Sequence, residues 1–265
     1  MALCVVVGGR AEGLFEELFA LMPGAPRAEA SSVPRDDHVM WARDAPAGKL
    51  KQRMRPLLRR VADLARGMAA RLPEAADATR WRSDAQCSLY QADGSRYARH
   101  VDNRCADGYG QRCNGRRLSA IYYVNPVWEA DHGGELRLWG KRGGGSDGRE
   151  AAGEVVEPRV DVAPTSDRLV LFWSDERNPH EVLPSHAPRF AISIWLYSTA
   201  ELSRAAPATR AAMMLLPIEG GAGGRLTLRR QGRHLGMRAM SSDHTGALRS
   251  WLAGFAGSRR RTIPL

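Results

Sequence analysis

Residues 167–182 read DRLVLFWSDERNPHEV, and they join an apolar run to a turn that presents His180. The run LVLFW is short, rich in branched and aromatic side chains and bounded by polar residues, a pattern that predicts a buried strand. A second apolar run, RFAISIW, begins at Arg189. These two strands indicate a β-sheet core, and the turn between them holds the first candidate functional residue.

The same β-like character extends over the whole region from Trp81 to Tyr197. Short runs with strand composition alternate there with Gly, Asn, Asp and Pro. Two intervals, residues 104–116 and 140–153, are predicted to be loops. Helices are predicted before the strands, so we expect a mainly β protein with supporting helices, an antiparallel double sheet of the jelly-roll type. Eight strands are predicted, at residues 85–91, 96–102, 117–125, 134–139, 155–162, 167–173, 180–183 and 189–197.

Two amphipathic helices are predicted before these strands. Apolar residues recur at helical spacing over residues 12–22 and again over 57–72, where Pro56 suits a first turn and Pro73 ends the run. We therefore expect residues 1–80 to form a helical support region, with the β core at residues 81–200. Residues 201–265 form a basic C-terminal extension to which the sequence assigns no role.

The net charge of +10 is concentrated in the C-terminal extension. Residues 204–265 contain eleven arginines and two acidic residues, a net charge of +9. A solvated basic face is the simplest interpretation of this segment. Binding to RNA, DNA or an acidic membrane surface is the alternative. The charge therefore says little about a site in the β core.

Four cysteines, Cys4, Cys87, Cys105 and Cys113, are too few and too scattered for a disulfide framework. Cys105 and Cys113 share one loop and could pair or bind a metal ion, but no second pair completes a zinc site, so we expect free thiols. The N-terminal apolar run lacks a preceding basic segment and is more typical of a first strand than of a signal peptide. No apolar run approaches the roughly 18 residues that span a bilayer. We expect a soluble intracellular protein, cytoplasmic or nuclear, with no membrane span.

Three side chains have the types and spacing of a metal site. Residues 97–103 are predicted to be extended, and residues two apart on a strand project from the same face, so His100 and Asp102 point the same way. If the turn at residue 180 brings His180 alongside them, two imidazoles and a carboxylate face one metal ion. That arrangement, with coordination positions left open, is typical of non-heme Fe(II) oxygenases. Arg189 has a planar guanidinium that can bind both oxygens of a carboxylate.

Five stretches stand out in a fixed order along the chain: YARHVDN (97–103), IYYVN (121–125) with Trp128, GGELR (133–137), residues 167–182 and RFAISIW (189–195). Together they resemble the 2-oxoglutarate and Fe(II)-dependent prolyl hydroxylases, and within them the hypoxia-inducible-factor prolyl hydroxylase subfamily. The resemblance implies a double-stranded β-helix core and hydroxylation of a prolyl residue in a protein, with release of succinate and CO2. It also implies Fe(II), 2-oxoglutarate and O2 as cofactor and cosubstrates, and L-ascorbate as reductant.

The resemblance also implies a role for each matched position at the site. His100, Asp102 and His180 are the expected iron ligands. Arg189 and Tyr123 are expected to bind the distal carboxylate of 2-oxoglutarate.

Further positions are expected to complete the pocket. Tyr90 is expected near the metal-chelating end of the cosubstrate. Arg99 could guard the substrate entrance, although a solvated surface charge is the simpler interpretation. Walls of the pocket are expected from Leu136, Val182 and Trp195, each of which could instead be an ordinary core residue.

Two alternatives remain open from the sequence. An oxygenase of the same mechanism could act on another residue or on nucleic acid, for which the basic extension is the only support. A non-catalytic module could keep the fold and bind a metal or a partner, but such a module has no evident use for Arg189. The loops at residues 104–116 and 140–153 exceed the corresponding connections of the subfamily, and such loops select substrates. The protein substrate therefore stays open.

Overall fold

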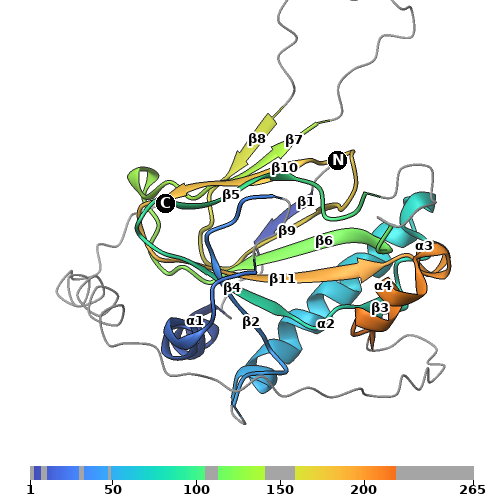
Figure 1. The fold of residues 1–265 in the computed structure, drawn as a ribbon, viewed down its shortest axis with the longest axis horizontal. Helices are drawn as coiled ribbons and strands as arrows, with labels where there is room; N and C mark the ends of the chain where they lie inside the picture. The colour runs from blue at the N-terminus through green and yellow to red at the C-terminus, as the bar shows by residue number, and fades with distance from the viewer. Residues whose placement is uncertain are drawn as a thin grey trace, which may run out of the picture.

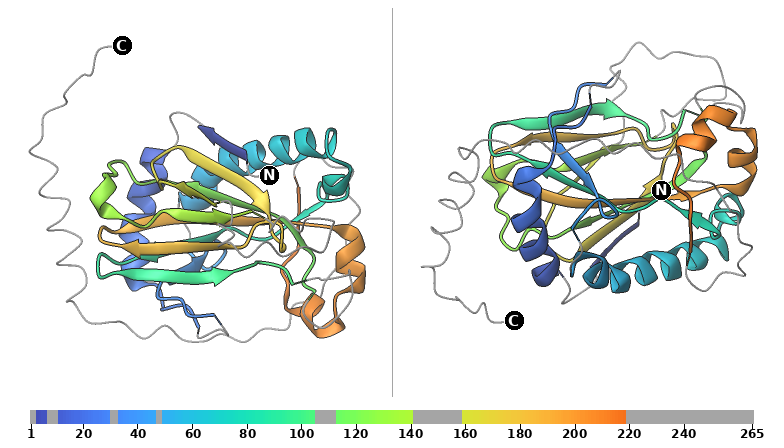
Figure 2. Two further views of the ribbon diagram at one scale, coloured as in Figure 1. Left: turned by 90° about the horizontal axis from the view of Figure 1, so that it is seen from above. Right: turned by 60° about the horizontal axis from the view of Figure 1, so that its bottom comes forward.

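The computed structural model of the chain describes residues 3–6, 11–29, 33–46, 49–104, 113–140 and 159–218. Two antiparallel sheets, one large and one small, lie over each other, and the long helices cover the large sheet on its other side (Figures 1 and 2). The predicted mainly β architecture, a jelly-roll double-stranded β-helix core, is confirmed.

The large sheet has eight strands, and its centre is β11 (Arg189–Tyr197). On one side β11 pairs with β6 (Arg116–Tyr123), which is followed by β9 (Arg168–Trp173) and β1 (Leu3–Val6). On the other side it pairs with β4 (Gln86–Tyr90) and β3 (Trp81–Arg82), which continue to β2 (His38–Trp41) and β12 (Leu216–Pro217).

The small sheet contains four strands in the order β5-β10-β7-β8. Their bounds are Ser95–His100 for β5, His180–Ser185 for β10, Leu136–Trp139 for β7 and Arg159–Val162 for β8. All eight strands predicted from Trp81 onward are present; β11 has the predicted ends, and the other seven differ from the prediction at one or both ends. Residues 155–158, the predicted start of β8, lie outside the described part of the chain. The predicted first strand is also present, as β1. The short strands β2, β3 and β12 were not predicted.

Side-chain alternation along β11 separates the two cores of the protein. Phe190, Ile192 and Ile194 pack toward the helices, whereas Ala191 packs against the small sheet. The same alternation holds in β6, where Tyr122 packs toward the helices and Tyr123 packs against the small sheet. Residues of β11 with the parity of Ala191 therefore face the space between the sheets, and these include Arg189, Ser193 and Trp195.

Two helices cover the outer face of the large sheet. They are α1 (Ala11–Leu21), followed by a 3-10 turn, Met22–Gly24, and α2 (Leu50–Ala69). The buried stripe of α2 begins with Leu50 and Met54, so the helix starts well before the predicted first turn and Pro56 lies inside it. Burial of each such large apolar side chain contributes about 1.5–3 kcal/mol, which offsets the hydrogen bond that proline cannot make.

Segments outside the predicted core also join it. From residues 1–80, β1 and β2 add strands to the large sheet, so this region supports the core with strands as well as helices. After β11, the short helices α3 (Thr199–Arg204) and α4 (Pro207–Ala212) pack beside one end of the sheets (Figure 2). The division at residues 80 and 200 stays a prediction, and residues 219–265 lie outside the described part of the chain.

The prediction that all cysteines are free thiols holds only in part. Cys87 is a free and fully buried thiol, as predicted. The prediction of a free thiol is wrong for Cys113, which is disulfide-bonded. Cys105 and the side chain of Cys4 lie outside what the structure describes. Scattered spacing was therefore a poor guide to Cys113, because disulfide pairing depends on tertiary proximity. No helix among the described residues is long and apolar enough to cross a membrane.

Candidate metal and cosubstrate site

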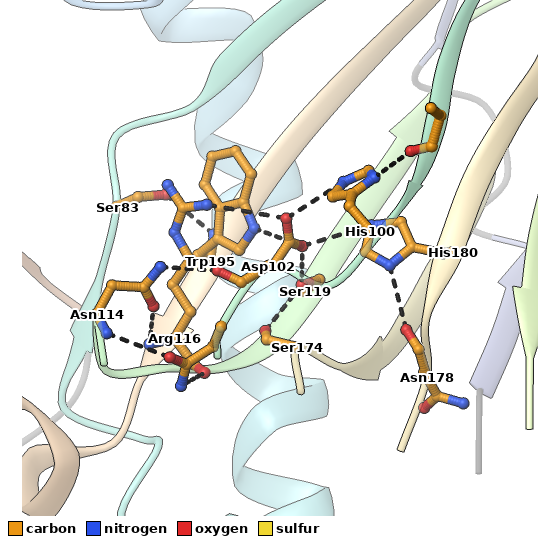
Figure 3. A network of polar contacts seen from close by, with 12 residues as sticks. Ser83, His100, Asp102, Asn114, Arg116, Ser119, Ser174, Asn178, His180 and Trp195 are labelled. Atoms are coloured by element: carbon orange, nitrogen blue, oxygen red, sulfur yellow. Dashed lines mark hydrogen bonds and ion pairs between the residues drawn. The ribbon is translucent and has the colours of Figure 1, made fainter. Parts of the chain in front are cut away.

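The predicted metal ligands come together at one end of the small sheet. His100 ends β5, His180 begins β10, and the two are direct cross-strand partners. One ligand atom from each of His100, Asp102 and His180 lies within 4.8 Å of the others. Figure 3 shows both imidazoles turned toward the carboxylate. The structure therefore brings together two imidazoles and a carboxylate, the donor set expected for Fe(II).

Backbone carbonyls orient both imidazoles. Nδ1 of His100 lies 2.8 Å from the Ala98 carbonyl oxygen, and Nδ1 of His180 lies 3.2 Å from that of Asn178. A carbonyl oxygen only accepts, so each Nδ1 carries the proton and each Nε2 presents its lone pair. The two Nε2 atoms lie 3.8 and 3.7 Å from the Asp102 carboxylate oxygens. The hydrogen bonds from Nδ1 to the two carbonyl oxygens therefore suit neutral imidazoles that bind a metal ion through Nε2.

Asp102 reaches the site from a bend and not from a strand. The predicted strand at residues 96–102 is wrong at its end, because β5 stops at His100. Hydrogen bonds hold the carboxylate instead: Ser119 Oγ donates to Oδ2 at 2.5 Å, and Trp195 Nε1 donates to the same oxygen at 2.9 Å (Figure 3). Arg116 adds its guanidinium 3.8 Å from Oδ1. The side-chain geometry, not strand periodicity, aims Asp102 at the histidines.

The electrostatics favour the protonation states that metal ligands need. Burial, followed by the nearby His180, lowers the pKa of His100 to about 4, so this imidazole is neutral at physiological pH. Burial alone would raise the pKa of Asp102, but His180 and Arg116 lead the groups that lower it to about 2. The site therefore combines a neutral imidazole with an anionic carboxylate.

A pocket between the sheets runs from the triad to Arg189. Its empty space, including the open mouth, is about 670 Å³. Arg189 is 1% exposed, donates from Nε to the Gly134 carbonyl oxygen at 2.7 Å and from Nη2 to the Tyr123 hydroxyl at 3.4 Å. Within the described residues, no carboxylate lies within ion-pair distance of Arg189. A buried cation without an anion is costly, so this pocket is suited to an acidic ligand.

A Gly-Gly turn makes the support of Arg189 possible. Gly133 and Gly134 have φ of +63° and +66°, a backbone conformation that glycine adopts without strain. A Cβ on Gly134 would lie 3.0 Å from Cδ of Arg189, and one on Gly133 would clash with the Pro184 carbonyl oxygen. The pair belonged to a matched stretch of the sequence, but its role was not predicted.

The other predicted cosubstrate and wall residues also line this pocket. Tyr90 is buried, and the guanidinium carbon of Arg189 lies 4.9 Å from the centre of its ring. Leu136 and Val182 are cross-strand partners and both face the pocket. Trp195 lines the pocket too, but its indole also binds Asp102, a contact that the sequence did not indicate.

Arg99 lies apart from these residues. It is exposed, it is not among the residues that line the pocket, and its guanidinium carbon lies 4.3 Å from the centre of the Trp139 ring. An entrance role for Arg99 stays a prediction.

The N-terminal region contributes a support that sequence reasoning missed. The Tyr97 ring stacks on His100 with centroids 3.7 Å apart and planes 18° apart. The guanidinium carbon of Arg35 lies 4.5 Å from the centre of the Tyr97 ring, and Arg35 binds both carboxylate oxygens of Asp37. Arg35 lies far from His100 in sequence, so no local pattern could have linked them.

Comparisons with known proteins agree with this geometry. Residues 85–197 match the family model of the 2OG-Fe(II) oxygenase superfamily. Over 125 residues the chain is 41% identical to Prolyl hydroxylase EGLN3 of Mus musculus, which covers 47% of this chain and 44% of that protein. Over 174 residues it is 36% identical to the hypoxia-inducible factor prolyl hydroxylase of Caenorhabditis elegans, which covers 64% of this chain and 21% of that protein. The chain thus spans less than half the length of these relatives.

Solved structures resemble the fold. A prolyl hydroxylase from Trichoplax adhaerens, in complex with a hypoxia-inducible-factor peptide fragment, superimposes with a TM-score of 0.57 at 25% identity, covering 76% of this chain and 84% of that one. A prolyl-4-hydroxylase from Pseudomonas putida gives a TM-score of 0.54 at 24% identity, covering 74% and 91%. The second likeness supports the fold alone.

Proposed function

We propose that this chain, whose residues 85–197 belong to the 2OG-Fe(II) oxygenase superfamily, is an Fe(II)- and 2-oxoglutarate-dependent dioxygenase that hydroxylates a prolyl residue in a protein. One observation carries the proposal. One pocket is lined by two imidazoles and a carboxylate that could bind a metal ion, and by the buried guanidinium of Arg189, which has no counter-ion among the residues that the structure describes. Such a pocket is matched to a dianionic ligand that reaches from a metal ion to Arg189.

The proposed reaction balances without a further oxidant. 2-Oxoglutarate and O2 give succinate and CO2, and the second oxygen atom is inserted into a prolyl C–H bond to form hydroxyproline. Bound Fe(II) would supply the site at which O2 is activated. L-Ascorbate is proposed as the reductant that keeps the iron in its ferrous state between turnovers.

The protein's own side chains bind and orient the reactants. His100, His180 and Asp102 would hold the iron, with their positions set by the carbonyl, hydroxyl and indole contacts described above. Arg189 and the Tyr123 hydroxyl would bind the distal carboxylate of 2-oxoglutarate, which supplies the missing anion. Around them, the apolar walls made by Leu136 and Val182 would exclude water and strengthen the ion pair.

The prolyl specificity rests on the relatives. Two of them are named prolyl hydroxylases, one of the hypoxia-inducible factor, and the Trichoplax structure holds a peptide of that factor. A proline-containing protein or peptide is therefore the proposed partner. The alternative substrate, nucleic acid, depends on the basic extension, most of which lies outside the described residues. A non-catalytic module would leave Arg189 buried without an anion.

Two measurements test this function. Purified protein with Fe(II) and 2-oxoglutarate is expected to release succinate, and His180→Ala is expected to abolish the release. Mass spectrometry of proline-containing peptides after incubation is expected to show an added oxygen on proline. Oxidation confined to other residues would remove the prolyl assignment and keep the oxygenase. Equal absence of succinate in both proteins would favour the binding module.

A further inference from the structure

Asp102 is the one member of the triad that no strand holds. His100 and His180 lie on paired strands, whereas Asp102 follows the end of β5. Its place relative to the two imidazoles therefore depends on how the chain is fixed just beyond β5. Asn103, the next residue, is 1% exposed and makes the contacts that fix this point.

Asn103 uses its backbone donor and its whole side-chain amide. Its backbone N–H donates to the Ser174 carbonyl oxygen at 2.8 Å. Its side-chain Nδ2 donates to the Arg116 carbonyl oxygen at 2.8 Å and to Oε2 of Glu201 at 2.9 Å, and its Oδ1 accepts from the Asn114 backbone N–H at 3.2 Å. Since an amide NH₂ has two donors, both are satisfied, and one of them by a carboxylate from α3.

The local structure of α3 directs Glu201 inward. Ser198 caps the helix, and its Oγ accepts from the Glu201 backbone N–H at 3.1 Å. In a capping box, a glutamate at this third position would bind the N–H of the cap residue. Here the Ser198 N–H donates to the Gly115 carbonyl oxygen at 2.9 Å instead. The Glu201 carboxylate is thus free to bind Asn103, and its Oε1 pairs with Nη2 of Arg117 at 2.8 Å.

Asn114 and Trp195 also hold Asp102, and Trp195 packs against the same helix. Asn114 donates from Nδ2 to the Asp102 carbonyl oxygen at 2.7 Å, and its Oδ1 accepts from the Arg116 N–H at 3.1 Å (Figure 3). Leu202, next to Glu201, is buried in a cluster with Trp195, whose indole donates to the Asp102 carboxylate. α3 therefore contacts Asn103, the neighbour of Asp102, through Glu201, and it packs through Leu202 against the tryptophan that binds the Asp102 carboxylate.

We propose that Glu201 is a positioning residue for the metal ligand Asp102, acting through Asn103, so that the first turn of α3 is part of the metal site. The inference rests on the proposed function, because it assigns Asp102 as a ligand. It gives a role to the start of a segment, residues 201–265, to which the sequence assigned none. Loss of the Glu201 carboxylate would loosen residue 103 and let Asp102 leave its position beside the histidines.

The test is metal binding by the purified protein, with Co(II) as a spectroscopic probe that needs no turnover. Glu201→Ala is expected to weaken Co(II) affinity by about tenfold, the lower end of the effect of removing residues that orient metal ligands. The d–d absorption of bound Co(II) is expected to change as the carboxylate ligand moves. A merely structural role would lower the melting temperature and leave both the affinity and the spectrum unchanged.

Ser203→Ala, on the exposed face of the same helix, is the matched control and is expected to bind Co(II) like the wild type. Glu201→Gln keeps the shape and an acceptor for Asn103 but makes a weaker, uncharged hydrogen bond, so we expect an intermediate loss of about threefold. Should Glu201→Ala not fold, this variant decides. Wild-type affinity and spectrum in the folded variants would overturn the inference, whereas failure of the wild type itself to bind Co(II) would overturn the proposed function.

Discussion

The Trp195 indole donates a hydrogen bond of 2.9 Å to the same carboxylate oxygen of Asp102 that accepts from Ser119. Trp195 therefore does more than wall the pocket, since it fixes the carboxylate that completes the metal-ligand set. Its own position depends on the cluster formed with Trp81 and Leu202 at the end of the large sheet.

Trp195→Phe is expected to keep the pocket wall and remove this hydrogen bond. Affinity for Fe(II), measured by anaerobic titration, should fall by about tenfold because the carboxylate loses an orienting donor. Trp81→Phe is the matched control, because both tryptophans are 7% exposed and share one cluster. Wild-type affinity in Trp195→Phe would show that the indole N–H does not position Asp102.

Arg189→Lys is expected to raise the 2-oxoglutarate concentration needed for half-maximal succinate release by about 30-fold, equivalent to about 2 kcal/mol. Lysine keeps the charge but cannot donate to Gly134 and bind a carboxylate at both oxygens. Arg137→Lys, at an exposed ion pair with Asp161, is the control and should leave the requirement unchanged. An unchanged 2-oxoglutarate requirement in Arg189→Lys would contradict the proposal that Arg189 binds the distal carboxylate of 2-oxoglutarate.

Gly134→Ala is expected to destabilise the protein by more than the strain of positive φ alone, which costs about 1–2 kcal/mol. A Cβ at this position meets Arg189 and Ser185, whereas one on Gly94, at φ +84°, meets nothing within 4 Å. Gly94→Ala therefore measures the strain alone in urea unfolding. If both variants lost the same free energy of unfolding, the close approach of Gly134 to Arg189 would have no energetic consequence.

The Cys87 thiol is expected to resist alkylation at pH 8 in the folded protein and to react once the protein is unfolded. Burial raises the pKa of Cys87 to about 12, above the usual 9.0. Because the pKa of Cys87 is higher in the folded than in the unfolded protein, the protonated thiol contributes stability below pH 9. This contribution is lost as the pH rises from 9 toward 12. Cys87→Ala should therefore lose less free energy of unfolding over that pH interval than the wild type. An equal loss in the two proteins would contradict the raised pKa of Cys87.

Mn(II) is expected to raise the melting temperature of the wild type. Saturation at about 100 times the dissociation constant stabilises the folded state by about 2.7 kcal/mol. His180→Ala should gain almost nothing under the same conditions, and EDTA should reverse the gain in the wild type. Equal stabilisation of both proteins would place the metal elsewhere.

The long strands of the core could be predicted because they carry apolar runs bounded by polar and turn residues. β11 is buried at eight of its nine positions, and its ends were predicted correctly. In contrast, β3 and β12 are two residues long, and β2 is four. These short strands form only because the tertiary structure brings them beside another strand of the large sheet. No periodicity in the sequence marks them.

The residues of the site also fall into those that the sequence indicated and those that it did not. The residue types and spacing of His100, Asp102 and His180, with Arg189, indicated the chemistry, because ligands must be of a particular kind. The residues that hold these side chains in position could not be predicted, since any hydroxyl, indole or carboxylate at the right place can make the same hydrogen bonds. Glu201 lies 98 residues beyond Asn103, and nothing near either residue connects them.

The isotopic composition of succinate formed under 18O2 tests directly whether the protein is a 2-oxoglutarate-dependent dioxygenase. With Fe(II), 2-oxoglutarate and a proline-containing peptide that serves as substrate, the account predicts that succinate gains one 18O atom and hydroxyproline gains the other. Succinate without 18O, or no succinate at all from protein that binds Fe(II), would contradict a 2-oxoglutarate-dependent dioxygenase built on His100, Asp102 and His180.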